Sequence, residues 1–291
     1  MFKINLRKLI LPFIAISVAI ACGSTKNSIS ESKSLEVNEA KENNLYIIST
    51  KFGDMKIKLL DETPLHRDNF KKLVADSFYD GTLFHRVIEG FMIQGGDPSS
   101  KNAKPGQQLG TGNIEYTIPA EFNSKLIHKK GALAAARQSD AVNPDKESSG
   151  CQFYIVDGNK VNERALKSIS SRKDIMRKRT LGTKVLDNPS NAQLKKDFIR
   201  VRQKGLKDSI NFYGAIIQDQ IDTLYNGSKF KYTPQQIALY DSIGGTPALD
   251  MDYTVFGEVI EGLNIIDSIS IQQKDRMNRP FDDVKMTIKK L

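Results

Sequence analysis

An alternation of apolar and polar positions near residue 50 predicts a β-hairpin. Residues 45–50 read LYIIST, and residues 55–60 read MKIKLL, where apolar and basic side chains alternate. A half-buried strand has this period of two, because successive side chains point to opposite faces of a sheet. Gly53-Asp54 lies between the two runs and is typical of a tight turn.

Later apolar runs of strand length predict several more short strands. Gly and Pro interrupt these runs, as turns interrupt consecutive strands. The runs lie within 82–122 and 131–156, at 254–260 and at 284–288.

Two helices are expected beside these strands. Thr63-Pro64 offers an N-cap followed by proline at the first helical position. An apolar stripe at helical spacing then runs from Leu65 to Val74 and ends near Gly81. A shorter helix is expected from Gly262 to Ile269. Many short strands with two helices favour a mainly β fold, a barrel capped by helices.

The pattern changes between residues 159 and 246. Apolar residues recur every three to five positions from Leu194 to Leu224, which predicts one amphipathic helix beginning after Asn188-Pro189-Ser190. A more basic helix is expected over 161–179, and Thr233-Pro234 opens a third helix that Gly244-Gly245 stops. We therefore predict that a helical insert, 159–246, interrupts a β domain formed by 45–158 and 247–291.

The N-terminus is typical of an export signal. Three basic residues precede an apolar run, Leu9 to Ile20, that is short for a membrane span. The run ends at Ala19-Ile20-Ala21-Cys22-Gly23, which resembles a bacterial lipoprotein cleavage site. That resemblance implies removal of residues 1–21 and lipidation of Cys22; an ordinary signal peptide is the alternative.

A polar segment separates this signal from the β domain. Residues 22–44 are rich in Ser, Asn, Lys and Glu, which predicts a flexible tether. The protein is therefore expected in the cell envelope, lipid-anchored and facing the periplasm. Gly23 follows the cysteine where an aspartate would favour the inner membrane, so the outer membrane is preferred.

Positive charge is concentrated in the insert. The chain has a formal charge of +9, and residues 159–246 alone contribute 17 basic and 8 acidic residues. Such asymmetry indicates a unit with its own partners, such as acidic envelope surfaces or acidic proteins. A solvated helix face without a partner is the alternative. Nucleic acid is not expected, because the chain is marked for export.

The sequence indicates no metal and no cofactor. His66 and His128 have no companion ligands at metal-binding spacing, and Gly95-Gly96 lacks the Lys-Ser/Thr of a phosphate loop. Only two cysteines are present, so a lipidated Cys22 would leave Cys151 without a disulfide partner. Cys151 is interpreted as a small buried core residue.

The segment FHRVIEGFMIQGGDP, residues 84–98, combines groups that neither a core strand nor a surface loop needs together. Glu89-Gly90 is a turn signal, and a hairpin around it would bring Arg86 near Phe91, Met92 and Gln94. The result would be a shallow apolar floor with a cation and an amide at its rim. A proline within a peptide suits such a site. Arg86 as a structural ion-pair partner is the alternative.

This segment resembles the signature of the cyclophilin-type peptidyl-prolyl cis-trans isomerases. Three later blocks resemble that family in the same order: GALAAAR at 131–137, SSGCQFYIV at 148–156 and YTVFGEVIEGLNIID at 253–267. The resemblance implies an eight-stranded closed β-barrel with two capping helices, which the helical insert would interrupt. It also implies isomerisation of Xaa-Pro bonds in exported proteins, assisting their folding.

The resemblance assigns roles to individual residues. It places Arg86, Phe91 and Gln94 in catalysis. The residues implied in substrate binding are Met92, Ala136, Arg137, Gln152, Tyr154, Leu249 and Tyr253. Ala136 and Arg137 would act through backbone groups. Ala248 and Tyr253 depart from the residues common in the family, which puts cyclosporin affinity in doubt. The alternative function is a non-enzymatic peptide-binding chaperone or scaffold that works through the basic insert.

Overall fold

The computed structural model describes residues 44–225 and 230–291. The chain divides into two units, Met1–Glu42 and Asn43–Leu291, and the description below concerns the second. The predicted signal peptide, the lipidated Cys22 and nearly all of the predicted tether lie outside the described residues. None of the helices in the described residues has both the length and the apolar character needed to cross a membrane.

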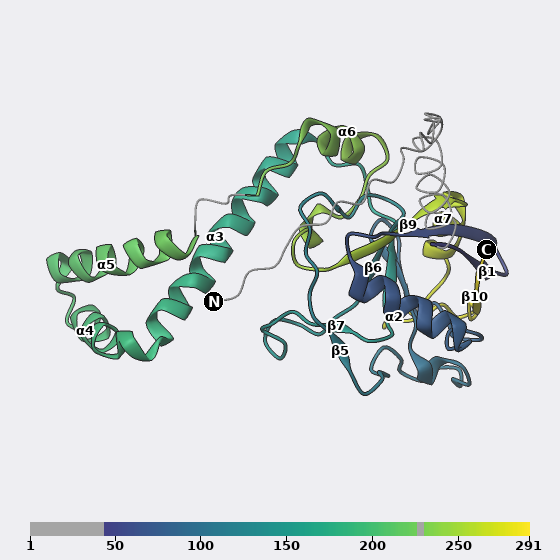
Figure 1. The fold of residues 1–291 in the computed structure, drawn as a ribbon, viewed down its shortest axis with the longest axis horizontal. Helices are drawn as coiled ribbons and strands as arrows, with labels where there is room; N and C mark the ends of the chain where they lie inside the picture. Colours follow the sequence, from purple (N-terminus) through teal and green to yellow (C-terminus); the bar gives the residue numbers. More distant parts are fainter. Residues whose placement is uncertain (1–43, 226–229) are drawn as a thin grey trace, which may run out of the picture. The chain divides into compact units, whose positions relative to one another are not determined.

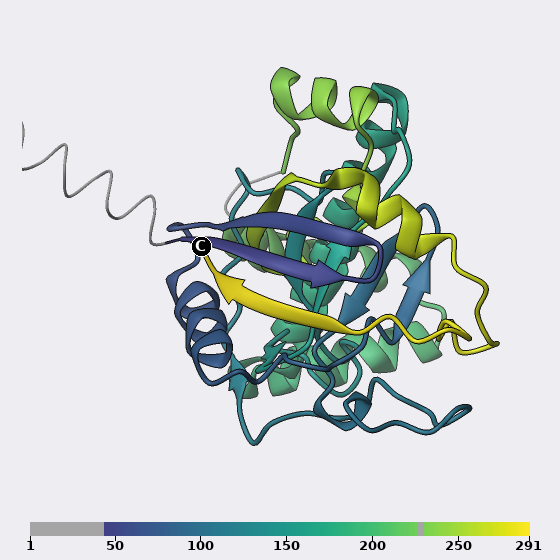
Figure 2. The ribbon, with the colours of Figure 1, turned by 90° about the vertical axis from the view of Figure 1, so that its right-hand side faces the viewer.

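A single antiparallel sheet of eight strands organises the fold (Figures 1 and 2). The strands are β1 (Leu45–Thr50), β2 (Gly53–Leu59), β3 (Arg86–Ile88), β4 (Met92–Gly95), β6 (Ala132–Ala135), β8 (Phe153–Val156), β9 (Val255–Glu261) and β10 (Met286–Lys290). Their order across the sheet is β10-β1-β2-β9-β6-β8-β4-β3. Strands from both ends of the chain therefore lie side by side, as the purple hairpin and yellow β10 do in Figure 2.

The sheet curls into a half-barrel, so the expected closed barrel is wrong. The two end strands, β3 and β10, do not pair with each other as strands. Next to them, Leu83 and Lys285 form an isolated bridge. Backbone hydrogen bonds from Phe84 N to Val284 O and from Gly81 N to Met286 O, each at 2.9 Å, flank that bridge. The outer edge of β3 is already occupied, because Val87 N donates to Asn278 O at 2.8 Å. This contact of β3 is with the loop before β10 and not with β10 itself.

The first hairpin forms as predicted, but its turn lies two residues earlier than Gly53-Asp54. Thr50 pairs with Gly53, so the two-residue turn is Lys51-Phe52 and Gly53 already belongs to β2. Gly53 has a φ of +124°, a conformation that favours glycine. Gly53 therefore lies next to the turn, as the first residue of β2, and not within the turn as predicted.

The two faces of the sheet carry two apolar clusters. On β8, Phe153 and Ile155 point into the larger cluster, while Tyr154 and Val156 point into the smaller one. Both faces of this strand are buried, which explains its uninterrupted FYIV sequence. The larger cluster is the main core, and Phe70, Tyr79 and Phe153 pack there edge to face or tilted. The smaller cluster lies on the face that carries the candidate site.

Two helices pack against the sheet at the predicted places, α2 (Pro64–Ala75) and α7 (Leu263–Ser270). Pro64 begins α2, but the Thr63 side chain makes no capping hydrogen bond. The carboxylate of Glu121 instead accepts from the backbone N–H groups of Leu65 and His66 at 3.1 and 3.0 Å. A residue distant in sequence therefore caps this helix, and it also binds His66 Nδ1 at 2.7 Å.

The predicted insert is helical, with one helix more than expected (Figure 1). Its helices are α3 (Glu163–Asp187), α4 (Ala192–Gln203), α5 (Lys207–Tyr225) and α6 (Pro234–Ser242). The single helix expected from Leu194 to Leu224 is wrong, because the chain breaks between α4 and α5 at Gly205, where φ is +65°. The break lets α5 fold back, so that both α4 and α5 contact α3.

The remaining elements are short. A two-stranded sheet pairs β5 (Thr117–Ile118) with β7 (Ser148–Ser149). Three 3₁₀ turns complete the described residues: η1 (Pro98–Ser100), η2 (Pro189–Asn191) and η3 (Pro247–Leu249). Of these, η3 matters most for the site, because it carries Leu249.

Candidate active site

Nine of the ten predicted catalytic and substrate-binding residues line one open pocket of about 100 Å³. They are Arg86, Phe91, Met92, Gln94, Ala136, Arg137, Tyr154, Leu249 and Tyr253. They come from the hairpin of β3 and β4 with its turn, the segment after β6, β8 and the 247–253 segment. The fold therefore brings together positions that are up to 167 residues apart in the sequence. Their individual roles stay predictions.

The polar rim of the pocket depends on the register of one hairpin. Arg86 on β3 lies directly opposite Gln94 on β4, and Gly90 forms the turn with a φ of +68°. Arg86 Nη1 donates to Gln94 Oε1 at 3.1 Å, and Gln94 Nε2 donates to Gln152 Oε1 at 3.0 Å. The bond to Gln94 uses one of the five guanidinium donors and fixes the orientation of the group.

Gln152 is the tenth predicted residue, and the structure does not place it in the pocket lining. Its side chain is buried behind Gln94. Its Nε2 atom donates to the carbonyls of Gly110 and Gly112 at 3.1 and 2.5 Å. Gln152 therefore connects Gln94 to the loop that contains Gly110 and Gly112.

Asp97 anchors that same loop, and sequence reasoning missed it. Its fully buried carboxylate accepts from Ser99 N and Oγ at 2.8 and 2.5 Å, and from the backbone N–H groups of Gly110 and Gly112 at 2.6 and 3.2 Å. Burial by itself would raise the pKa of Asp97, but these hydrogen bonds outweigh burial and lower it. The GGD sequence was an available signal, since a buried acid needs such donors.

The cation at the rim has no nearby countercharge. Among the described residues, no carboxylate lies within ion-pair distance of Arg86, so the alternative of a structural ion pair is not supported. Burial lowers the pKa of Arg86. Arg86 therefore lines the pocket as a half-buried guanidinium, and no carboxylate of the described residues neutralises its charge.

The opposite side of the pocket is apolar and aromatic. Met92 and Tyr154 belong to the smaller core cluster, and Phe91, Leu249 and Tyr253 pack against it. The Tyr154 and Tyr253 rings meet edge to face, with their centroids 5.9 Å apart. A small apolar ring could lie on this wall while its amide faced Arg86 and Gln94.

The backbone groups of Ala136 are occupied within the protein, whereas no described backbone hydrogen bond involves Arg137. The N–H of Ala136 donates to Gln152 O at 3.0 Å, and its carbonyl accepts from Ser149 N at 2.8 Å. The backbone of Ala136 is therefore already engaged within the protein. The Arg137 side chain stacks over Tyr253, with its Cζ 4.4 Å from the ring centroid, and Nε donates to Asp252 O at 2.7 Å.

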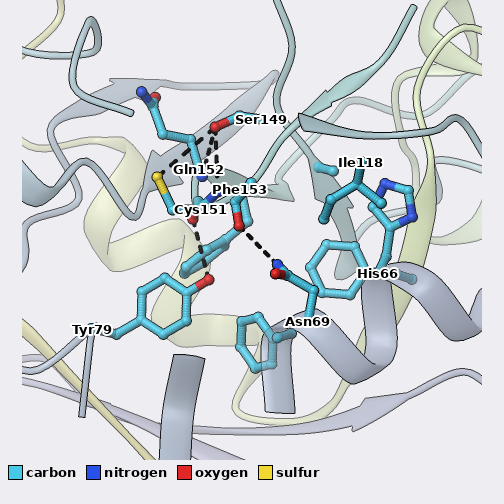
Figure 3. Close-up of a pocket in the computed structure, with 12 residues that line it drawn as sticks. His66, Asn69, Tyr79, Ile118, Ser149, Cys151, Gln152 and Phe153 are labelled. Atoms are coloured by element: carbon cyan, nitrogen blue, oxygen red, sulfur yellow. Dashed lines mark hydrogen bonds between the residues drawn. The ribbon is translucent and has the colours of Figure 1, made fainter. Parts of the chain in front are cut away.

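On the core side, the segment that leads into β8 lines a small cavity of about 10 Å³ (Figure 3). Tyr79 donates its hydroxyl to Cys151 O at 3.2 Å, and Asn69 donates to Gly150 O at 2.7 Å. Cys151 is buried in the main apolar cluster, as predicted, and burial raises the pKa of its thiol to about 11. These contacts fix the 150–153 segment from the core side.

The described residues contain no cluster of three or more His, Cys, Asp or Glu that could hold a metal ion. His66 is bound to Glu121, and His128 is bound to Asp250.

His85, beside the catalytic candidate Arg86, is expected to make stability depend on pH. Burial lowers its pKa from 6.5 to about 4. Between these values the unfolded chain binds a proton that the folded chain does not, so the free energy of unfolding falls as pH is lowered. We expect a contribution of about 2 kcal/mol between pH 7 and pH 5. Urea denaturation of the wild type and of His85→Leu at both pH values measures it; an equal pH dependence in both proteins would contradict it.

Comparisons with known proteins identify the family of this chain. A family model described as "Cyclophilin type peptidyl-prolyl cis-trans isomerase/CLD" matches residues 45–175 and 194–290. Relatives in Staphylococcus saprophyticus and Staphylococcus haemolyticus, whose provisional name is peptidyl-prolyl cis-trans isomerase, are each 27% identical to this chain. The alignments cover 82% and 87% of this chain, and 86% and 91% of the relatives.

Solved structures with a similar arrangement include a cyclophilin type peptidyl-prolyl cis-trans isomerase of Cryptosporidium parvum. Its crystal structure in the presence of the dipeptide Ala-Pro gives a TM-score of 0.46 at 19% identity, covering 84% of this chain and 96% of that chain. A second crystal structure of the same protein gives a TM-score of 0.46 at 18% identity, covering 84% and 97%.

Proposed function

This chain belongs to the family of cyclophilin-type peptidyl-prolyl cis-trans isomerases, and from that premise we propose that it assists the folding of exported proteins in the cell envelope. It is an isomerase of this class, and its fold is cyclophilin-like. The proposed substrates are proline-containing polypeptides, with the proline ring on the apolar wall and its amide at the rim.

The isomerisation requires no covalent chemistry from the enzyme. The Xaa-Pro bond resists rotation because the nitrogen lone pair is delocalised into the carbonyl, with a barrier of about 18–20 kcal/mol. Uncatalysed exchange takes roughly tens to hundreds of seconds. No bond breaks and no proton has to move, so the catalyst only has to bind the twisted amide more tightly than either planar form.

A single observation carries the proposed mechanism: Arg86 is fixed by Gln94 at the rim, opposite an apolar aromatic wall. As the amide twists, its lone pair localises on nitrogen and becomes an acceptor. A guanidinium is a permanent donor with a rigid planar fork, which suits this role. Because Gln94 and Gln152 already hold the group in place, little reorganisation is needed in the transition state.

The other residues divide between holding the ring and holding the peptide. Phe91, Met92 and Leu249 are proposed to contact the proline ring, while Tyr154 and Tyr253 close the aromatic wall. Gln94 is proposed to position the substrate carbonyl. The backbone of Ala136 is already engaged, so the residue before proline is assigned to the backbone of Arg137.

The test is cis–trans exchange of an Xaa-Pro peptide, followed by NMR with the purified protein. Acceleration that depends on Arg86 supports the proposal, and the variants are described in the Discussion. A folded protein that binds the peptide without accelerating exchange would leave a non-enzymatic peptide-binding chaperone instead.

We further propose that a lipid on Cys22 anchors the protein, with the periplasm-facing outer membrane preferred, and that the basic insert adds contacts with acidic surfaces or proteins. Membrane fractions of cells with wild type or Cys22→Ser, washed at low and high salt, separate these contributions. A lipid anchor resists salt, whereas charge contacts weaken. We expect wild type to stay bound in both washes and Cys22→Ser to be released at high salt. Release of the wild type by salt would contradict lipidation.

A further inference from the structure

The 247–253 segment supplies Leu249 and Tyr253 to the pocket, and the helical insert holds it from one side. The hydroxyl of Tyr232, just before α6, lies 3.2 Å from Pro247 O. Lys173 on α3 forms an ion pair with Asp252, which also binds Lys146. The insert is therefore in direct contact with the segment that forms one wall of the pocket.

Asp250 lies at the centre of these contacts. It is almost completely buried, and both carboxylate oxygens are occupied. Oδ1 accepts from the backbone N–H and from Nδ1 of His128, each at 2.8 Å. Oδ2 accepts from the hydroxyls of Tyr232 and Tyr240 at 2.9 and 2.6 Å. The insert therefore supplies two of the four hydrogen bonds that satisfy this buried charge.

His128 extends the network to the pocket wall. Because Nδ1 faces the Asp250 carboxylate, we assign a ring proton to Nδ1. The Tyr154 hydroxyl lies 2.9 Å from Nε2, within hydrogen-bond distance. His128 and Tyr154 also stack, with ring centroids 6.0 Å apart and an interplanar angle of 16°. Tyr154 is thus fixed both by its hydroxyl and by its ring.

These contacts form a continuous series of hydrogen bonds from the insert to the aromatic side of the pocket. The connection runs from Tyr232 and Tyr240 through Asp250 and His128 to Tyr154. Removal of one donor from a buried charged acceptor leaves that acceptor under-satisfied, and the remaining partners shift to compensate. Such a shift would reach the pocket through His128 and through the backbone next to Asp250.

We propose that Tyr232 and Tyr240 of the insert are positioning residues of the isomerase pocket. Through Asp250 and His128 they hold Tyr154 in position. Through the 247–253 segment they hold Leu249 and Tyr253 in position. The insert is thus part of the substrate-binding apparatus, besides any partner that its basic surface binds. The activity readout rests on the proposed isomerase function; the affinity and hydrogen-exchange readouts do not.

The experiment uses the full chain with Tyr240→Phe, which removes one hydroxyl and keeps the ring. We expect the Kd for an Xaa-Pro peptide, measured by NMR titration, to rise roughly fivefold, with exchange at saturating peptide changed less than about twofold. Amide hydrogen exchange at Asp252 and Tyr253, whose N–H groups bond to Leu249 O, should quicken. In a Tyr154→Phe background the affinity loss should shrink at least about twofold, because one route is already cut.

Tyr225→Phe is the matched control. Tyr225 is also a buried tyrosine of the insert whose hydroxyl binds a carboxylate, that of Asp174, but Tyr225 does not line the pocket. We expect Tyr225→Phe to leave peptide affinity and the two amides unchanged. If Tyr240→Phe fails to fold, Lys173→Met replaces it in the test. Lys173 lies nearer the surface and holds the same segment through Asp252. We expect the Kd of Lys173→Met for the Xaa-Pro peptide to rise as well.

Three results would overturn the proposal: a folded Tyr240→Phe with wild-type affinity and wild-type amide exchange, an equal effect from Tyr225→Phe, or full additivity with Tyr154→Phe. A wild type that binds peptide but does not accelerate exchange would instead refute the isomerase function, and the affinities would still test positioning. If the wild type binds no peptide, the Asp252 and Tyr253 amides decide.

Discussion

Replacing Arg86 by alanine is expected to lower kcat/KM for Xaa-Pro exchange by roughly 100-fold to 1,000-fold, the usual effect of removing one pre-organised donor to a transition state. This corresponds to about 3–4 kcal/mol of lost transition-state stabilisation. The fold should persist, because Arg86 is only half-buried and its one hydrogen bond is to Gln94. Exchange spectroscopy on a Xaa-Pro peptide measures the rate, and thermal denaturation checks the fold.

Two further variants sharpen this result. Arg86→Lys keeps the charge but loses the planar fork that Gln94 orients, so we expect an intermediate rate. Arg67→Ala removes an arginine from α2 that pairs with Asp61 and Asp68, and we expect no change in exchange rate. A folded Arg86→Ala protein with a rate near that of the wild type would exclude the guanidinium from catalysis.

The second large effect is expected on stability, from Asp97→Ala. The substitution leaves the Ser99, Gly110 and Gly112 donors without their shared acceptor in a buried site. We expect a loss of about 3–5 kcal/mol in the free energy of unfolding. Because Gly110 and Gly112 also accept from Gln152, the alignment of Gln94 should suffer and kcat/KM should fall as well.

Urea denaturation measures this loss, and Asp282→Ala provides the matched control. Asp282 is an exposed aspartate that pairs with Lys51, so its removal should cost less than about 1 kcal/mol. The lowered pKa of Asp97 adds a second test, since its stabilising contribution is present above about pH 4 and is lost as pH falls further. Equal losses in the two variants would show that the Asp97 hydrogen bonds do not stabilise the loop.

Much of the polar rim could be predicted from the sequence, because it depends on local geometry. A turn signal at Glu89-Gly90 fixes a hairpin, and a hairpin register decides which side chains face each other. The opposition of Arg86 and Gln94 therefore follows from residues only eight positions apart. The same reasoning from local signals predicted α6 and α7 close to their observed ends and α2 at its observed start, whereas α2 ends at Ala75 and not near Gly81.

Contacts between distant segments were not accessible in this way. The capping of α2 by Glu121, the anchoring of the loop by Asp97 and the placement of Gln152 behind Gln94 each join segments that no local pattern relates. The closed barrel was wrong for the same reason, since pairing of β3 with β10 would also join distant segments. The helix break at Gly205 differs, because this glycine is a local signal that lies within the apolar periodicity from which one helix was predicted.

By itself, the sequence determined the family, the hairpin at the site and the helical character of the insert, because motifs and periodicities are local. Only the tertiary structure decided what the insert touches. Tyr232 and Tyr240 meet Asp250 because α6 returns the chain to the sheet, and a buried carboxylate must collect donors from whatever segments surround it. Which segments these are depends on how the whole chain packs, and no short stretch of sequence records it.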